Sequence, residues 1–318
     1  MIPLEWFEQA RERISPHILK TPLISDQSGQ FFYKLENRQR TGSFKVRGAL
    51  NKILALQPWE RERGLVAASA GNHGQGVALA GQLTHARVIV FAPGDVSAVK
   101  LDAMRSLGAE VRLVAGGYEL AEQTAIRFAA ENQLTWVSPY NDGLVIAGQG
   151  TIALELMEQG VLSGVETCLI PLSGGGLFCG IAIVLKQFFP AMKIVGVQAA
   201  GSPFMHALWR GKDQQAVEEV LGLADGLEGA VEANAMTIPI VRQLANDIIL
   251  VTEDEIARGM GYAWCELGEK IEGSAAVTLA ATLSGKINAS SSILIFSGGN
   301  VTPSIHNEVC EKYRAAID

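Results

Sequence analysis

The sequence alternates short apolar segments with longer segments in which apolar residues recur at helical spacing. In one half of the chain this pattern predicts strands and helices in turn, at residues 65–68, 74–83, 87–92, 98–107, 110–114 and 118–131. Parallel strands need a crossover connection, which is usually a helix. The alternation therefore predicts an α/β fold whose parallel sheets are flanked by helices.

A second series of the same kind follows later in the chain. It predicts a strand, a glycine-rich turn, a helix and two further strands, at residues 168–172, 173–176, 177–188, 194–197 and 292–296. A chain of 318 residues with 48% hydrophobic content can bury a large core and is long enough for two domains. With no low-complexity linker between the two series, we expect two modules between which the chain crosses more than once.

Charge and cysteine content exclude several classes of protein. The net charge of −7 is spread without long runs of one sign, which argues against a nucleic-acid partner. The four cysteines lie far apart in sequence and form no C-x-x-C pair, so neither a disulfide framework nor a zinc site is predicted. A reducing cytoplasm is the expected location.

Neither a secretion signal nor a membrane partner is predicted. Residues 1–15 carry several charges and lack the apolar core of a signal segment. Residues 167–185 are uncharged and nearly long enough to span a bilayer, but Ser-Gly-Gly-Gly in their middle would interrupt a helix. We interpret that stretch as a buried strand, a loop and a buried helix.

Lys45 is the candidate catalytic residue. A lysine amine can hold an aldehyde cofactor as a Schiff base and, once released, remove a proton from Cα of an amino acid. Lys and Arg together number 26, so a lysine on its own would more often be an ordinary surface residue. Its surroundings, T-G-S-F-K-V-R-G-A-L, favour the functional interpretation because they place small residues and an aromatic ring beside it.

Two glycine-rich loops follow strands and precede helices. The first, S-G-G-G at Ser173 to Gly176, suits a phosphate because glycines let backbone N–H groups approach it and the helix N-terminus attracts the charge. A tight structural turn is the alternative.

The second glycine-rich loop, S-A-G-N-H-G at Ser69 to Gly74, could hold a smaller anion. Asn72 could also act as a helix N-cap. His73 is more often structural than catalytic at such a position.

A dinucleotide site is the other interpretation of these glycines. Gly74-Gln75-Gly76 opens a helix after a strand, but the third glycine of G-x-G-x-x-G would fall at Leu79, and the next strand is not followed by an acid for a ribose. This interpretation therefore fails.

Together these segments resemble the fold-type II pyridoxal-phosphate enzymes of the serine/threonine dehydratase and serine racemase family. The resemblance extends to residues 146–151 and 251–256 and covers nearly the whole chain. It implies a two-domain fold similar to that of the tryptophan synthase β-subunit. The large cofactor-binding domain would comprise residues 1–55 and 142–318, and a small mobile domain residues 56–141. It also implies a homodimer or a higher homo-oligomer.

The resemblance assigns a role to each part of the site. Pyridoxal 5'-phosphate would be bound by Lys45 and Phe44, by Asn72, by Ser297 at the pyridine nitrogen, and at its phosphate by Ser173, Gly174, Gly175, Gly176 and Leu177. The substrate carboxylate would be held by Ser69, Ala70, Gly71, Asn72 and His73. Glu272 matches a position near the cofactor ring. A serine cannot stabilise a charged pyridinium, which favours prompt loss of a β-substituent.

Several departures bear on the reaction. Ala70 stands where racemases of the family have a serine for proton transfer on the second face, although the neighbouring Ser69 could substitute for it. Gln198 and Phe204 stand where racemases have carboxylates that bind a divalent cation, so we expect no metal. Tyr140 and Ala121 also differ from racemase-type residues and predict a side-chain pocket of different size or polarity.

We therefore expect a dehydratase that converts a β-hydroxy-L-amino acid, L-threonine or L-serine, to a 2-oxo acid and ammonia by α,β-elimination. Lys45 would take the Cα proton, and the cofactor phosphate would protonate the departing hydroxyl. A serine racemase, and a dehydratase for 3-hydroxyaspartate or an aryl serine, are the alternatives within the family. A pyridoxal-phosphate-binding protein without catalytic activity is the alternative outside it.

Overall fold

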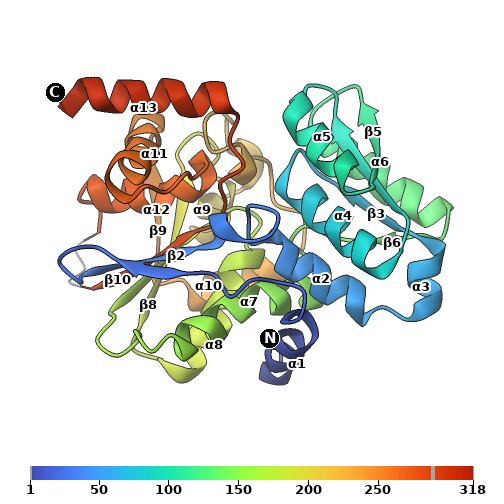
Figure 1. Cartoon of the computed structure of the whole chain (residues 1–318), viewed down its shortest axis with the longest axis horizontal. Coiled ribbons are helices and arrows are strands. Elements are labelled where there is room, and N and C mark those ends of the chain that lie inside the picture. Colours follow the sequence, from blue (N-terminus) through green and yellow to red (C-terminus); the bar gives the residue numbers. More distant parts are fainter. Residues whose placement is uncertain (1, 288–290, 318) are drawn as a thin grey trace.

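The strands form two separate sheets, as Figure 1 shows. The structure is a computed structural model that describes residues 2–287 and 291–317. The larger sheet has six strands and the smaller sheet has four. Both sheets are flanked by helices, so the predicted α/β class is confirmed.

The larger sheet has the strand order β1-β2-β10-β7-β8-β9. Its strands are β1 (Leu23–Ser25), β2 (Phe31–Leu35), β7 (Thr167–Pro171), β8 (Lys193–Ala199), β9 (Asp247–Val251) and β10 (Ser292–Phe296). All neighbouring pairs are parallel except the edge pair β1 and β2, which is antiparallel. The sequence pattern located β7, β8 and β10 to within a few residues, whereas it did not predict β1, β2 or β9.

The smaller sheet is entirely parallel, with the strand order β5-β4-β3-β6. Its strands are β3 (Leu65–Ala68), β4 (Val88–Pro93), β5 (Glu110–Val114) and β6 (Thr135–Trp136), and the helices within this part of the chain are α3 (Pro58–Arg63), α4 (Asn72–Thr84), α5 (Ala98–Ser106) and α6 (Tyr118–Glu131). The predicted order of strands and helices from residue 65 to residue 131 is confirmed.

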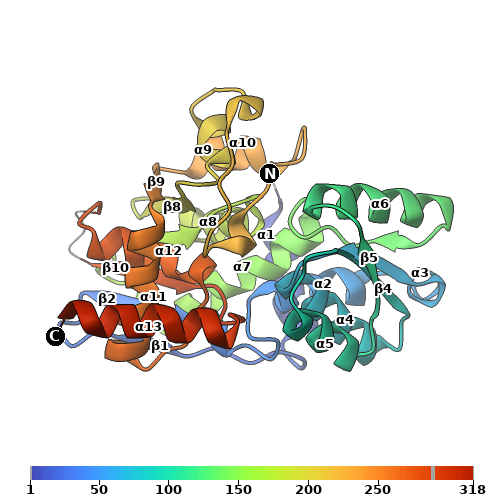
Figure 2. The same ribbon diagram turned by 90° about the horizontal axis from the view of Figure 1, so that it is seen from above.

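Helices cover both faces of each sheet because successive side chains of a buried strand point to opposite sides. In β7, Cys168 and Ile170 face α7 and α8, whereas Leu169 faces the other core with α11 and α12. The helices outside the smaller sheet are α1 (Leu4–Ile14), α2 (Lys45–Ala55), α7 (Gly143–Glu158), α8 (Gly176–Phe188), α9 (Phe204–Trp209), α10 (Thr237–Leu244), α11 (Glu253–Leu267), α12 (Gly273–Leu283) and α13 (Pro303–Ile317), with short 3-10 turns η1 (Glu36–Arg38), η2 (Gln214–Ala216) and η3 (Asp225–Leu227). Figure 2 shows α11 and α13 on one side of the larger sheet, with α9 and α10 on the other.

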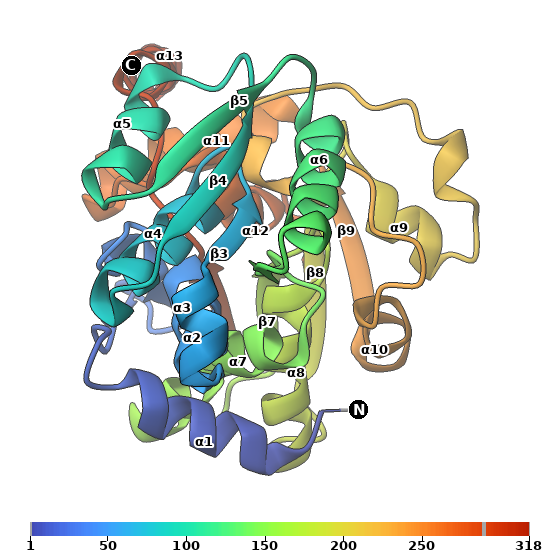
Figure 3. The ribbon, with the colours of Figure 1, turned by 90° about the vertical axis from the view of Figure 1, so that its right-hand side faces the viewer.

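The smaller sheet also has two helical layers. Leu65 and Ala67 of β3 pack with α2 and α4, and Val66 and Ala68 of the same strand pack with α6. Figure 3 shows α6 running beside β3 and β4.

Helix α2 connects the two halves of the molecule. Its Val46, Leu50 and Ile53 belong to the core of the smaller sheet. On another side its backbone lies so close to α7 that a Cβ added at Gly148 would stand 2.6 Å from the Arg47 carbonyl oxygen. The predicted domain boundary after residue 55 stays a prediction, but the helix just before it packs with both parts.

No helix among the described residues is long and apolar enough to cross a membrane. The uncharged stretch at residues 167–185 forms β7, the glycine-rich turn and most of α8, as the sequence predicted.

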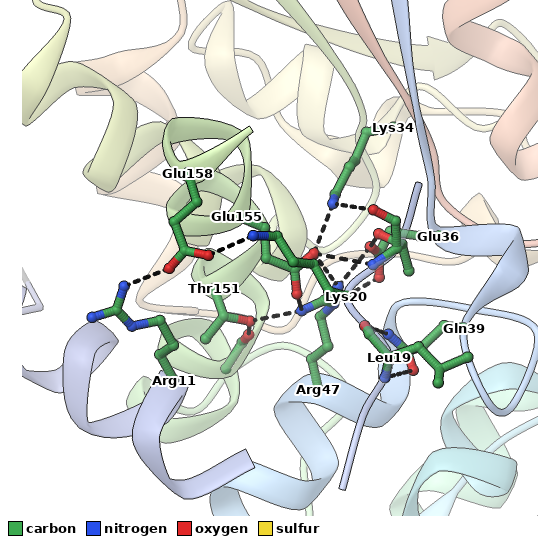
Figure 4. A network of polar contacts seen from close by, with 12 residues as sticks. Arg11, Leu19, Lys20, Lys34, Glu36, Gln39, Arg47, Thr151, Glu155 and Glu158 are labelled. Atoms are coloured by element: carbon green, nitrogen blue, oxygen red, sulfur yellow. Dashed lines mark hydrogen bonds and ion pairs between the residues drawn. The ribbon is translucent and has the colours of Figure 1, made fainter. Parts of the chain in front are cut away.

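A buried network of charges fixes α2 against the larger sheet and α7 (Figure 4). Arg47 donates to both carboxylate oxygens of Glu36, at 2.7 and 2.8 Å, and to both of Glu155, at 2.7 and 3.0 Å. Lys34 of β2 adds a 2.7 Å ion pair to Glu155. The side chains of Lys34, Arg47 and Glu36 are fully buried. Burial raises the pKa of Glu155, but Arg47 and Lys34 lower it by more, so the net shift is downward. The network therefore pairs two cations, Arg47 and Lys34, with two carboxylates, Glu36 and Glu155.

Replacing Arg47 with methionine is expected to lower the free energy of unfolding by about 3–5 kcal/mol, because two buried carboxylates lose their bidentate partner. Urea unfolding of the purified protein measures this. The matched control is Arg87→Met, which removes the exposed Arg87–Glu110 ion pair and should change stability by less than about 1 kcal/mol. Equal losses in both variants would contradict the structural importance of the network.

Candidate active site

Lys45 is the first residue of α2 and lies beside the carboxyl end of β10. The Phe44 N–H donates a 3.0 Å hydrogen bond to the carbonyl oxygen of Ser297, and Ser43 forms a β-bridge with Gly298. These bonds join two segments that are more than 200 residues apart in the sequence. The Lys45 amine in turn donates a 3.0 Å hydrogen bond to the carbonyl oxygen of Pro139.

The environment of the Lys45 amine makes it easier to deprotonate than an ordinary lysine. Burial lowers its pKa to about 8, and the carboxylates of Glu272 and Glu122 limit that decrease. The Phe44 ring lies 5.3 Å from the amine. About a tenth of Lys45 is therefore neutral, and nucleophilic, at pH 7, compared with less than about one in a thousand for an ordinary lysine.

The S-G-G-G loop follows β7 and leads into α8, as predicted, and its glycines are needed for packing. Gly175 has a φ of +92°, a left-handed conformation that favours glycine. A Cβ at Gly174 would stand 2.5 Å from the Tyr140 ring, and a Cβ at Gly176 would stand 2.8 Å from the Tyr140 Cβ. Because α8 begins at Gly176, the N–H groups of its first turn, including that of Leu177, have no acceptor within the helix. This arrangement suits a phosphate.

The second loop follows β3 and leads into α4. The Gly71 N–H donates a 2.9 Å hydrogen bond to the Ser69 hydroxyl. Asn72 is the first residue of α4 rather than its N-cap, which is Gly71, so the N-cap interpretation of Asn72 is wrong. The backbone N–H groups at this helix start can bind a carboxylate.

His73 is a structural residue in this arrangement. Its Nε2 donates a 2.8 Å hydrogen bond to the Val137 carbonyl oxygen. Burial and the nearby Lys45 charge lower the pKa of the ring to about 3, although the bond to Val137 opposes this decrease. A neutral ring whose proton is held by a carbonyl is unsuited to act as a general base near neutral pH.

An amide and carboxylate network connects the smaller sheet to the larger one. The Asn72 amide donates a 2.7 Å hydrogen bond to Glu272, and the Asn300 amide donates a 2.7 Å bond to the Asn72 side-chain oxygen. The Asn300 N–H binds the second Glu272 oxygen at 3.1 Å. Burial, with a contribution from Asp225, raises the pKa of Glu272 to about 7. From the sequence, Glu272 was expected only to lie near the cofactor ring, and Asn300 was assigned no role. The one sequence feature that marks Asn300 is its position directly after Ser297-Gly298-Gly299.

The predicted site residues thus converge from the carboxyl ends of β3, β7 and β10. The Phe44 N–H bond joins the residue before Lys45 to Ser297. Tyr140, which follows the Pro139 that binds the Lys45 amine, lies against the S-G-G-G loop. Ser297, directly after β10, is buried. A desolvated amine, a glycine-lined helix start and a buried hydroxyl fit a cofactor with an aldehyde, a phosphate and a ring nitrogen.

The remaining predicted positions lie outside this centre or have other neighbours. Gln198 accepts a 2.9 Å hydrogen bond from the His206 N–H, and Phe204 begins α9. Within the described part of the chain no group of three or more His, Cys, Asp or Glu residues could hold a metal ion. That this enzyme needs no divalent metal stays a prediction. Ala121 is fully buried, whereas its neighbour Glu122, which sequence reasoning missed, interacts electrostatically with Lys45.

The lowered pKa of Lys45 predicts how cofactor-free protein takes up pyridoxal phosphate. Only the neutral amine attacks an aldehyde, so the rate should rise with pH around a midpoint near 8 rather than near the ordinary value of 10.5. The measurement is the rate at which visible absorbance appears over a series of pH values. Lys212→Ala, at an exposed lysine, should give the same profile, and a midpoint above 10 would contradict the effect of burial.

Comparison with known proteins agrees with this geometry. A family model described as pyridoxal-phosphate dependent enzyme matches residues 14–298. An L-threonine ammonia-lyase of Thermotoga maritima is 36% identical over 319 residues, 98% of this chain and 79% of the relative. That of Geobacter sulfurreducens is 36% identical over 322 residues, with the same coverage. The solved structure of maize serine racemase has a TM-score of 0.87 at 30% identity and covers 99% of this chain and 98% of the racemase. This chain belongs to the family of pyridoxal-phosphate dependent enzymes.

Proposed function

We propose that this protein is a threonine/serine ammonia-lyase that converts L-threonine or L-serine to a 2-oxo acid and ammonia. The observation that carries the proposal is the Lys45 amine, whose burial lowers its pKa to about 8 at the point where the loops after three strands converge. The similarity to two L-threonine ammonia-lyases over nearly the whole chain supports it.

The residues present suit pyridoxal phosphate. Lys45 would hold its aldehyde carbon, Ser173 to Leu177 its phosphate, and Ser297 its ring nitrogen, with Phe44 and Asn72 beside the ring. When bound, this cofactor withdraws electrons from Cα of an attached amino acid and so makes the Cα proton acidic.

The chain itself would bind the substrate and move one proton. Backbone N–H groups of the loop from Ser69 to His73 would hold the substrate carboxylate and orient Cα–H toward Lys45. The neutral Lys45 Nζ would accept the Cα proton, and the Cβ–OH bond would break, so that overall the Cα proton and the hydroxyl are lost as one molecule of water. The resulting enamine tautomerises to an imine and takes up one water molecule, which gives the 2-oxo acid and ammonia.

The structure supports elimination over racemisation. Racemisation requires a proton donor on the face of Cα opposite Lys45, and Ala70 has no such group. The neighbouring Ser69 hydroxyl accepts the Gly71 N–H, and the Ser69 Cβ lies against Gly74 of α4. Its side chain is thus turned into its own loop, which argues against Ser69 as a substitute donor.

We also propose that the protein acts in the cytoplasm, as a homodimer or a higher homo-oligomer, without a divalent metal. Residues 56–141 would form the small mobile domain. The packing of α2 in the core of the smaller sheet and against α7 supports α2 as the element about which such a domain would move.

The test is release of 2-oxo acid from L-threonine and L-serine by cofactor-loaded protein treated with a chelator. We expect release by the native protein and by Lys212→Ala, and none by Lys45→Ala, which lacks the only proposed base. The same samples are assayed for D-serine formed from L-serine. Turnover by Lys45→Ala would contradict the assignment of Lys45, and D-serine without 2-oxo acid would favour a racemase instead.

A further inference from the structure

Two glutamates from different parts of the chain interact with the reactive amine or with the segment that binds it. Glu122 lies in α6 of the smaller sheet, and Glu232 lies in the segment between η3 and α10 beside the larger sheet. Neither belongs to the loops that suit the phosphate or the substrate carboxylate. Both are therefore free of a role in the proposed reaction.

A continuous chain of contacts joins Glu232 to Lys45. The Lys45 amine binds the Pro139 carbonyl oxygen at 3.0 Å. Of the next two residues, Tyr140 accepts a 2.8 Å hydrogen bond from the Glu232 N–H at its hydroxyl oxygen, and Asn141 donates a 2.7 Å bond to Glu232 Oε2. Three consecutive residues, Pro139 to Asn141, therefore bind both the amine and Glu232.

The other carboxylate oxygen of Glu232 lacks a partner. Its Oε1 atom is buried and makes no hydrogen bond within the described residues. A buried carboxylate oxygen without a donor is unfavourable, and a bound ligand that supplies a donor would satisfy it.

Glu122 faces the same region from the smaller sheet. Its carboxylate accepts a 3.1 Å hydrogen bond from the hydroxyl of Tyr118. Burial and the proximity of Glu232 raise its pKa to about 7, while the Tyr118 bond and Lys45 lower it. Glu122 therefore interacts electrostatically with both Glu232 and the Lys45 amine.

We propose that Glu122 and Glu232 form the side-chain subsite of the enzyme and select amino acids whose side chain carries a hydrogen-bond donor and no negative charge. Glu232 Oε1 accepts the donor of the substrate side chain, and Glu122 adds to the negative potential. This inference rests on the proposed function and narrows its substrate class. A β-hydroxyl fits the subsite, whereas the carboxylate of 3-hydroxyaspartate is repelled by like charge.

L-Asparagine and L-aspartate provide a matched pair of probes, because their side chains have nearly the same shape and differ in charge. Dissociation constants are measured from the change in visible absorbance of the cofactor-loaded protein as each is added. The native protein is expected to bind L-asparagine at least about tenfold more tightly than L-aspartate, equivalent to about 1.4 kcal/mol.

Three variants locate the origin of that preference. Glu232→Gln and Glu122→Gln each remove one charge and should shift the ratio of the two dissociation constants toward one. Glu131→Gln is the matched control, since it removes an exposed acid from the same helix as Glu122 and should leave the ratio unchanged. Native preference for aspartate, equal binding of the two probes, no response to asparagine, or a ratio that neither active-site variant changes would overturn the proposal.

Release of 2-oxo acid from L-threonine is recorded on the same samples. Preference for asparagine without release from threonine would support the subsite and contradict the proposed reaction. Release from threonine without that preference would support the reaction and overturn the subsite.

Discussion

The buried pairing of Arg47 with Glu36 and Glu155 is the interaction on which the site depends. Arg47 is two residues beyond Lys45 in α2, and its partners belong to η1 and α7, so the network sets where the first turn of α2 begins. Removing one member would leave uncompensated charge in the interior, which is far more unfavourable than breaking a surface pair. The reactive amine is thus placed by a rigid framework rather than by a mobile loop.

Around that amine the molecule uses opposing electrostatic effects. Burial favours the neutral form of Lys45, while Glu122 and Glu272 favour the charged form, and the resulting pKa is about 8. Burial also raises the pKa of each of these two carboxyl groups to about 7. Lysine and acids therefore titrate close to neutral pH, where small changes in the site alter their protonation.

Most of the fold followed from local patterns. Strands β3, β5 and β10 and helix α6 have the predicted bounds. Helix α6 is amphipathic, and the strands are short apolar or alternating segments bounded by turns. Strand β1 was missed because it has only three partly exposed residues, and β6 because it has only two. Strand β9 was missed although its apolar run from Ile248 to Val251 is a strand signal. The N-cap role of Asn72 was wrong because its side-chain oxygen, which would accept from the helix backbone, accepts instead from the Asn300 amide.

The sequence by itself determined the α/β class, the lysine and the two glycine-rich loops, because backbone conformation and local chemistry depend on neighbouring residues. Only the tertiary structure decided which side chains share the space around Lys45. Glu122 and Glu232 are separated by more than 100 residues, and nothing in either local segment distinguishes them from surface acids. Their interaction depends on the tertiary packing that brings α6 near the segment before α10, which itself binds the residues after β6.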